Sequence, residues 1–354
     1  MKRILHIVEP FATGILSFLL GLTKKQADEY EVYIAYGLRP LTPVGVEDLF
    51  DDRIHLIKVF EFNGARSVFN PKAYLRIRSL FNKINPDVVH LHSSASGIIG
   101  RWALPCNKVN IYYTPHGFSF LMQGHGIIVQ YFFWLAEYFS AKRNATIIAC
   151  SKGEFNEAQK LTNRCTYVNN GVNTRELEPY VMPCDISKEK IKICTCGRIL
   201  YQKNPALFNQ IALKLSFVDF IWIGDGELKN ELSAPNITIT GWVTREYALQ
   251  IMSLSDLFIL PSLWEGLPIS LLEAMFLKKV CLVSNVVGNR DVINNMENGF
   301  ICNTVDEYVN RIKDVIDKNK YCELITQNAH DDILHNYDIE RMSMNYSLIY
   351  KQNT

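Results

Sequence analysis

Short apolar runs alternate with amphipathic stretches along most of the chain. In the first half these runs cover residues 4–8, 32–35, 88–91, 111–114 and 146–150. A second series covers residues 192–196, 220–223, 237–239, 257–260 and 280–283. Strands that alternate with helices form parallel sheets covered by helices on both faces. The pattern predicts an α/β protein with two doubly wound, Rossmann-like domains that face each other across a cleft.

A stretch without apolar periodicity separates the two series. Residues 178–183 contain two prolines and precede charged residues up to Lys192, which is typical of a linker. We therefore expect an N-terminal domain over residues 1–180 and a C-terminal domain over residues 190–337. A helical pattern over residues 339–350 predicts a last helix that returns to the first domain, so we assign residues 338–354 to it.

Composition narrows the class of protein. The 354 residues are 48% hydrophobic and 21% charged with a net charge of +1, which is typical of a globular protein and does not favour nucleic-acid binding. Residues 1–180 carry 20 Lys and Arg against 15 Asp and Glu, so the first half is mildly basic. This balance favours an anionic membrane surface. No run approaches the roughly 20 apolar residues of a membrane span, so we expect any membrane contact to be peripheral.

The beginning of the chain and its cysteines indicate a compartment. Residues 1–9 predict a first strand, because their apolar part is too short for a signal peptide and no cleavage site follows. The nine cysteines lack paired spacing, which predicts reduced core residues rather than disulfides. We therefore expect a cytosolic protein.

Two carboxylates follow the apolar run at residues 257–260. Glu265 is expected at the carboxyl end of a strand and Glu273 inside the next helix. Open α/β sheets bind ligands at this edge. Two carboxylates can hold hydroxyl groups, and the backbone N–H groups of residues 266–270 at a helix start can hold phosphate. A nucleotide sugar offers both kinds of group.

Two cations lie at the start of the second strand series. Arg198 follows the strand at residues 192–196, and Lys203 precedes the next helix. They are well placed to neutralise a diphosphate, although surface charges around a β–α turn would give the same pattern. The turn at residues 224–227 lacks the third glycine of a dinucleotide fingerprint, which disfavours an oxidoreductase. We expect Gly224 to let the backbone approach a neighbour, and a bound nucleotide would need the same space.

The first half contains histidines at predicted strand ends. His116 ends one strand, where a lone histidine is more often structural than catalytic. His90 and His92 share one face of another strand, but no third ligand has the spacing of a metal site. We expect them to line the cleft or to form hydrogen bonds in the sheet. Gly14 opens a helical pattern after the first strand and could cradle phosphate.

Two segments have alternative interpretations as core or as membrane contact. Residues 70–84 form a basic amphipathic pattern, which predicts a surface helix on the sheet more often than a membrane-binding one. The aromatic residues at 131–139 are likewise expected in the core rather than in a lipid-facing patch.

Taken in order, these motifs resemble glycosyltransferase family 4, whose members are retaining enzymes with the GT-B fold. The resemblance spans nearly the whole chain and rests on Thr13-Gly14, His116, Gly197-Arg198 with Lys203-Asn204, the turn at residues 224–227, and Glu265 with Glu273. Residues 90–94 and 113–119 are similar to the subset that builds capsule, exopolysaccharide or O-antigen repeat units on a lipid carrier. Many relatives carry two glycines in the first loop, whereas residues 10–14 contain one.

The resemblance implies roles for individual residues. Arg198 and Lys203 would stabilise the leaving diphosphate, and Glu273 would bind the ribose hydroxyls. Glu265 would contact the donor sugar, and His116 would face the reacting sugar. The implied catalytic residues are His116, Glu265, Arg198 and Lys203. The implied donor-binding residues are Gly14, Arg198, Lys203, Gly224, Gly266, Leu267, Pro268 and Glu273. The implied residues of the acceptor side of the cleft are His92 and Ser93.

The resemblance thus implies a retaining glycosyltransferase that needs no cofactor and no essential metal. It would move a hexose or N-acetylhexosamine from a nucleotide-diphosphate sugar, UDP-linked, to a lipid-linked oligosaccharide at the cytoplasmic face of the membrane. Two alternatives stay open at this point. A sugar-nucleotide epimerase or phosphorylase would turn over the donor without a glycan acceptor, and a non-catalytic module would bind nucleotide sugar without turnover.

Overall fold

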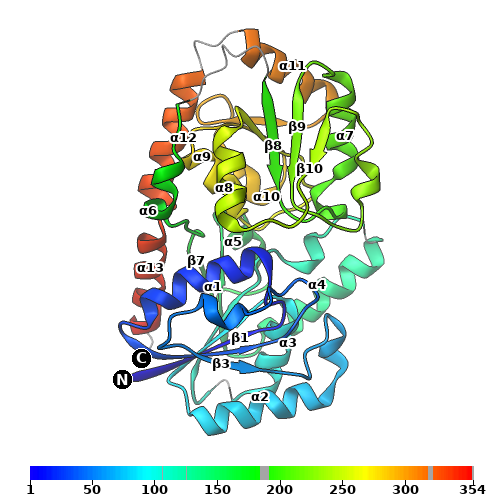
Figure 1. The fold of residues 1–354 in the computed structure, drawn as a ribbon. Helices are drawn as coiled ribbons and strands as arrows, with labels where there is room; N and C mark the ends of the chain where they lie inside the picture. The colour runs from blue at the N-terminus through cyan, green and yellow to red at the C-terminus, as the bar shows by residue number, and fades with distance from the viewer. Residues whose placement is uncertain (106, 125, 184–190, 318–321, 353–354) are drawn as a thin grey trace. The chain divides into compact units, whose positions relative to one another are not determined.

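The computed structural model describes residues 1–105, 107–124, 126–183, 191–317 and 322–352. The chain forms two compact units, one of Met1–Gly171 with Ile339–Thr354 and the other of Val172–Asp338 (Figure 1). The first boundary lies earlier than residue 180, because the backbone N–H of Val172 donates to the carbonyl of Tyr337 at 2.8 Å. The first part of the predicted linker thus belongs to the second unit, and residues 184–190 lie outside the described residues.

The first unit is built on a seven-stranded parallel sheet in the order β3-β2-β1-β4-β5-β6-β7. Its strands are β1 Lys2–Val8, β2 Tyr30–Tyr36, β3 His55–Lys58, β4 Val88–His92, β5 Asn110–Thr114, β6 Ala145–Ala149 and β7 Cys165–Tyr167. Its helices are α1 Thr13–Gln26, α2 Pro71–Ile84, α3 Ser94–Ala103, α4 Ile127–Ala141, α5 Lys152–Gln159 and α13 Ile339–Gln352.

The last helix, α13, belongs to the first unit, as the sequence predicted. It packs beside α1 on one face of the sheet, where the rings of Tyr346 and Tyr350 are fully buried. Helices α1 and α13 are so close that a Cβ added to Gly21 of α1 would lie 2.5 Å from Ile339 Cδ1 of α13. Helices α2 and α3 cover the other face.

Helix α2 confirms that residues 70–84 pack on the sheet. Its apolar stripe at Ala73, Ile77 and Leu80 is buried, whereas Lys72 and Lys83 are exposed. The prediction that the aromatic residues of 131–139 lie in the core was wrong for Tyr131, Phe132 and Phe139, which are more than half exposed. Trp134 and Tyr138 of the same helix, α4, pack against the core as predicted. None of the helices formed by the described residues is both long and apolar enough to cross a membrane.

The second unit has a six-stranded parallel sheet in the order β10-β9-β8-β11-β12-β13. Its strands are β8 Lys192–Cys196, β9 Asp219–Ile223, β10 Ile237–Ile239, β11 Leu257–Leu260, β12 Val280–Ser284 and β13 Phe300–Cys302. Its helices are α6 Thr174–Leu177, α7 Pro205–Lys214, α8 Arg245–Leu254, α9 Ile269–Phe276, α10 Val287–Arg290, α11 Val305–Asp317 and α12 Cys322–Asn336.

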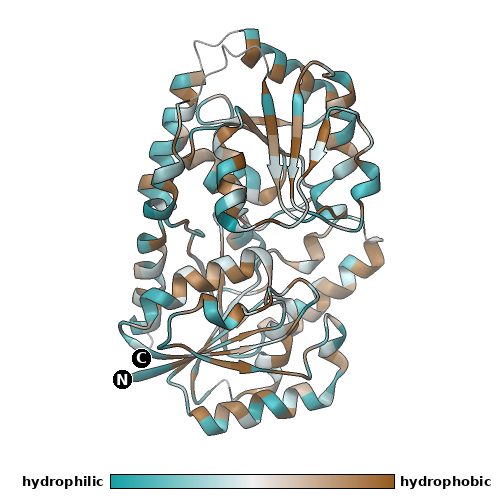
Figure 2. Cartoon of the chain, in the orientation of Figure 1, coloured by the Kyte–Doolittle hydropathy of each residue, from teal (hydrophilic) through white to brown (hydrophobic). Residues whose placement is uncertain are grey.

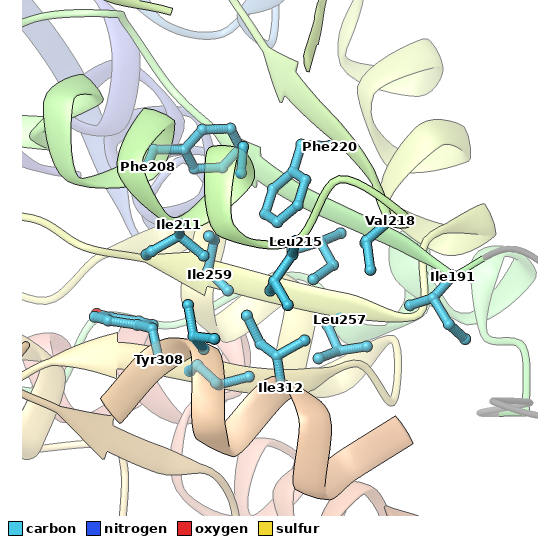
Figure 3. Close-up of a cluster of buried hydrophobic side chains, with 14 of the residues drawn as sticks. Ile191, Phe208, Ile211, Leu215, Val218, Phe220, Leu257, Ile259, Tyr308 and Ile312 are labelled. Carbon is cyan, nitrogen blue, oxygen red and sulfur yellow. The ribbon is translucent and has the colours of Figure 1, made fainter. Parts of the chain in front are cut away.

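One large hydrophobic cluster of the second unit lies between its sheet and helices α7 and α11. Figure 3 shows Phe208 and Ile211 from α7 above the strand residue Ile259, with Tyr308 and Ile312 of α11 below it. These five side chains are fully buried. Such close packing fixes the strands, and therefore the loops that leave their carboxyl ends.

Both sheets reverse strand order next to their first strand. In the first unit β1 lies between β2 and β4, and in the second β8 lies between β9 and β11. In the first unit the carboxyl ends of the central strands are level, because Val8 pairs with His92 and His92 with Thr114. Ligands of open α/β sheets bind at such a switch point, so in each unit the loops after these strands are candidate binding loops.

Candidate functional site

Glycines let the loops after β8 and β9 approach each other in the second unit. Gly197 and Gly224 have φ values of 145° and 137°, which disfavour a side chain. A Cβ on Gly224 would lie 2.3 Å from the carbonyl oxygen of Gly197. The expectation that Gly224 permits a close backbone approach is therefore confirmed, and its contact with a nucleotide stays a prediction.

Lys203 and Glu265 form an ion pair between the loops after β8 and β11. Lys203 Nζ lies 2.6 Å from Glu265 Oε1, and the two side chains are only 17% and 7% exposed. The neighbouring Gln202 donates from Nε2 to the Trp264 carbonyl at 2.8 Å. Asn204, at φ 54°, then caps the start of α7. The structure thus brings together two of the four predicted catalytic residues.

Arg198 lies at the same sheet edge but pairs with another partner. Its guanidinium forms an ion pair with Glu227, with 3.1 Å between Nε and Oε2. The pKa of Glu227 is lowered by its own backbone N–H and by Arg198. Exposed pairs of this kind contribute at most about 1 kcal/mol, so an arriving anion can compete for the guanidinium.

Glu273 is held by an arginine that the sequence analysis missed. Arg245 Nη1 lies 2.5 Å from Glu273 Oε1, and the negative charge of Glu273 raises the pKa of Arg245. Arg245 is the first residue of α8, a position where the helix dipole favours acidic residues. That unfavourable placement is the signal by which Arg245 could have been found. Burial, reinforced by Glu273, raises the pKa of the adjacent Cys196 to about 12.

The start of α9 supplies the remaining predicted donor contacts. Gly266 and Leu267 lead into Pro268, the residue before the helix, and no side chain caps this end. Its first turn contains no acidic residue. A Cβ on Gly288 would lie 2.2 Å from the Gly266 carbonyl oxygen, which fixes the path of this loop. An uncapped helix start with a defined path suits an anionic group.

Three residues with side chains have positive φ near the switch point of the first unit. Thr13, Ser93 and His116 have φ values of 51°, 73° and 55° and follow β1, β4 and β5. Positive φ is strained for residues other than glycine, and such strain concentrates at functional sites. A Cβ on Gly14, beside Thr13, would meet nothing within 4 Å, so packing does not require a glycine there.

His116 ends a buried chain of hydrogen-bonded side chains. Its Nε2 lies 3.1 Å from Nδ1 of His92, whose Nε2 lies 3.0 Å from Nδ1 of His6. His6 Nε2 in turn lies 2.8 Å from Oε1 of Gln26 on α1. Phe18 stacks edge-on against His116 at 4.7 Å between ring centroids. This series of hydrogen bonds links His116, a predicted catalytic residue, to the core of the sheet.

Burial keeps these histidines neutral, so each ring carries a single proton on one of its two nitrogens. It lowers the pKa of His116 to about 3 and that of His6 to about 4, and it also lowers the pKa of His92. The side-chain oxygen of Gln26, Oε1, can only accept, so His6 Nε2 carries the proton and donates to it. His6 Nδ1 is then unprotonated and accepts from His92 Nε2. In the same way, His92 Nδ1 accepts from His116 Nε2. His116 Nδ1 is then left unprotonated and can accept a hydrogen bond from a hydroxyl.

His6, His90 and His92 also resemble a metal-binding set. One nitrogen from each lies within 4.8 Å of the others, so the third histidine that spacing could not reveal comes from β1. Every ring nitrogen of the three already has a hydrogen-bond partner, because His90 contacts the hydroxyls of Tyr350 at 2.6 Å and Thr114 at 2.8 Å. The hydrogen-bonded interpretation of His90 and His92 is therefore confirmed.

Comparison with known families identifies the class of protein that carries these sites. A model described as Glycosyltransferase Family 4 matches residues 13–176, and one described as Glycosyl transferases group 1 matches residues 184–332. The chain belongs to glycosyltransferase family 4, and it is a glycosyltransferase.

Two curated relatives cover most of this chain. The chain is 30% identical over 306 residues to the UDP-Gal:alpha-D-GlcNAc-diphosphoundecaprenol alpha-1,3-galactosyltransferase of Escherichia coli, covering 76% of each chain. It is 24% identical to the O-antigen biosynthesis glycosyltransferase WbnH of Escherichia coli, covering 79% of this chain and 82% of the relative.

Solved structures share the fold. Sucrose-phosphate synthase from Thermosynechococcus elongatus matches with a TM-score of 0.83 at 14% identity, covering 99% of both chains. Anabaena HepE in complex with UDP and glucose matches with a TM-score of 0.79 at 16% identity, covering 99% of this chain and 100% of that one. The predicted GT-B architecture is thus confirmed.

Proposed function

We propose that this chain transfers a hexose or N-acetylhexosamine, with retention of configuration, from a UDP-sugar to a lipid-linked glycan. The observation that carries the proposal is the pairing of cations with carboxylates at one switch point. Lys203 lies against Glu265 and Arg245 against Glu273, so groups suited to phosphate stand beside groups suited to hydroxyls. A nucleotide sugar requires this combination.

The donor's diphosphate is neutralised by protein groups in this proposal. Lys203 and Arg198 supply positive charge, and the uncapped start of α9 supplies backbone N–H groups. Transfer therefore proceeds without an essential bound metal or cofactor. Glu273 holds the ribose hydroxyls and Glu265 the hydroxyls of the sugar.

The first unit supplies the acceptor side. His116 faces the reacting sugar, and its unprotonated Nδ1 accepts a hydrogen bond from a sugar hydroxyl. His92 orients this ring through the 3.1 Å contact between their nitrogens. Ser93 lies beside them with a buried Oγ that has no hydrogen-bond partner among the described residues, so it can bind an acceptor hydroxyl.

The acceptor and the pathway follow from the relatives' names. One relative acts on a diphosphoundecaprenol-linked sugar and another in O-antigen biosynthesis. We extend both properties to this chain, which would work at the cytoplasmic face of the membrane in the synthesis of O-antigen, capsule or exopolysaccharide. Among the residues that the structure describes, no feature of the site favours an epimerase, a phosphorylase or a non-catalytic binding module.

The test is transfer from a labelled UDP-sugar to lipids extracted from bacterial membranes. The proposal expects one labelled lipid-linked product whose new glycosidic bond has the anomeric configuration of the donor, measured by NMR coupling constants. Activity should persist after chelation of divalent cations. An inverted product would refute retention, a loss of activity on chelation would refute the metal-independent mechanism, and donor turnover without a glycan product would favour the epimerase alternative.

A further inference from the structure

Helix α4 presents the most apolar exposed surface of the first unit's helices. Its first three residues, Ile127, Ile128 and Val129, are all exposed, with Ile127 at 82%. Tyr131, Phe132 and Phe139 continue this surface further along the helix. Figure 2 shows α4 largely in the brown of hydrophobic residues. Contiguous exposed apolar surface of this kind marks an interaction site.

No charge interrupts this surface. Glu137 is the one Asp, Glu, Lys, Arg or His within α4, and it is buried and paired with Arg101 at 2.7 Å. Glu137 also accepts a hydrogen bond from the hydroxyl of Tyr113 at 2.8 Å. These contacts hold the inner side of α4 on the sheet, so its outer side is exposed in a fixed orientation.

Basic residues stand at the end of the apolar surface. Lys142 Nζ lies 4.6 Å from the ring centroid of Tyr138, and Arg143 Cζ lies 5.3 Å from that of the half-exposed Trp102. The unit as a whole carries 21 Lys and Arg against 14 Asp and Glu, a balance of +7. Aromatic rings beside basic side chains are typical of the boundary between acyl chains and phosphate headgroups.

We infer that the exposed face of α4 docks this enzyme on an anionic lipid bilayer. At 15 residues the helix is about 22 Å long, so it lies in the interface rather than crossing the membrane. It begins eleven residues after His116, and Gln130 donates from Nε2 to the Met122 carbonyl at 2.7 Å in the intervening loop. The inference rests on the proposed function in one respect, since a lipid-linked acceptor would then reach the loop that carries His116.

A bilayer fits this surface better than a second protein chain. Three consecutive residues of a helix point in directions about 100° apart, so the exposed first turn of α4 protrudes on several sides. A flat partner covers one side of such a turn, whereas fluid acyl chains surround it. The excess of positive charge complements acidic headgroups as well.

The test is co-sedimentation of the whole protein with vesicles of phosphatidylcholine alone or mixed with phosphatidylglycerol. The wild-type protein should bind the mixed vesicles and release partly at high salt. The Ile128→Glu/Phe132→Glu variant should lose about tenfold or more in binding, because each change puts a charge against acyl chains. Leu213→Glu is the matched control, since Leu213 is 55% exposed on α7 of the other unit and should bind as wild type.

Two further measurements keep this test separate from the proposed function. Donor turnover with a short, water-soluble acceptor should be unchanged in the α4 variant, which shows that its site is intact. Sedimentation velocity without lipid should show the same mass for both proteins. The inference is overturned if the wild type does not bind the mixed vesicles, if the variant binds equally well, or if the variant instead dissociates a dimer. Vesicle binding without any donor turnover would refute the proposed function and leave the docking surface standing.

Discussion

Lys203 Nζ lies 2.6 Å from Glu265 Oε1, and this ion pair joins the loops that leave β8 and β11. Both side chains are largely buried, so neither charge is well solvated without the other. The pair therefore has a structural role in addition to the roles in donor binding that we propose. The two contributions can be separated by experiment.

Replacing Lys203 with Met should leave Glu265 as an uncompensated buried charge. Removing one partner of a buried pair costs about 3–5 kcal/mol in the free energy of unfolding, and the partial exposure of Lys203 places the expected loss near the lower end. Glu265→Gln in the same background should restore most of this stability. Urea denaturation of the single and double variants measures the effect.

Transfer activity should not recover with stability in that double variant. We expect a loss of at least about a hundredfold in kcat, because the diphosphate and the sugar hydroxyls both lose a contact. If the double variant regained both stability and near wild-type transfer, the pair would be structural alone and its assignment to the donor site would be wrong.

Arg245 should act through Glu273. We predict that Arg245→Gln raises the KM for the donor about tenfold with a smaller change in kcat, because the Glu273 carboxylate loses the contact that orients it. Arg245→Lys should restore part of the affinity. Initial rates over a range of donor concentrations separate the two constants, and a fall in kcat with an unchanged KM would contradict a role in donor binding.

The Gly14→Ala substitution tests whether Gly14 is needed for donor binding rather than for packing of the protein. A Cβ at this position meets nothing within 4 Å, and alanine is favoured over glycine in a helix by about 1 kcal/mol. The variant should therefore be as stable as the wild type or slightly more stable, yet bind the donor more weakly if phosphate approaches this loop. Thermal unfolding and donor titration test both parts.

Gly97→Ala is the opposite case and serves as the control. Its Cβ would lie 2.3 Å from the ring of Tyr113, so we expect a clear loss of stability. A Gly14→Ala variant with unchanged donor affinity would remove Gly14 from the donor site.

Acid should destabilise the protein through its buried histidines. Burial lowers the pKa of His6 to about 4 and of His116 to about 3, whereas unfolded histidines titrate near 6.5. Between pH 6.5 and 4 the unfolded chain binds protons that the folded chain does not, so stability falls as pH falls through this window. Each such histidine contributes up to about 1.4 kcal/mol per pH unit.

Urea unfolding at a series of pH values measures this dependence. His6→Gln should flatten it, and His335→Gln should not, because His335 is exposed. Equal stability of the wild type at pH 7 and pH 5 would mean that the histidine chain accepts protons in the folded state, contrary to the tautomer assignment for His116.

The central strands of both sheets were predictable, and the missed ones are edge strands. β3, β7 and β13 each end a sheet and contain three or four residues. A buried central strand appears in the sequence as a continuous apolar run, whereas β3, with the pattern His55-Leu-Ile-Lys58, is half exposed and carries polar ends. Local pattern alone does not distinguish such a segment from a loop.

The site was predictable where one loop carries the chemistry and not where distant residues meet. Glu265 and Glu273 follow a clear strand, so their edge of the sheet could be assigned. Arg245 and His6 were missed, because each meets its partner on another element: Arg245 of α8 contacts Glu273 of α9, and His6 of β1 contacts His92 of β4. The exposed aromatic residues of α4 were misassigned because the sequence pattern of an apolar helix does not show whether its apolar side chains pack against the protein core or lie on the surface.

The most direct test of the account is nucleotide release from a panel of UDP-, GDP- and CMP-sugars, with and without membrane lipid extract. The account predicts release from one UDP-sugar that rises strongly when the lipid extract is added, since the acceptor is lipid-linked. This result would also name the sugar class. Absence of both release and binding for every donor would contradict the claim that the loops after β8 and β11 form a nucleotide-sugar site.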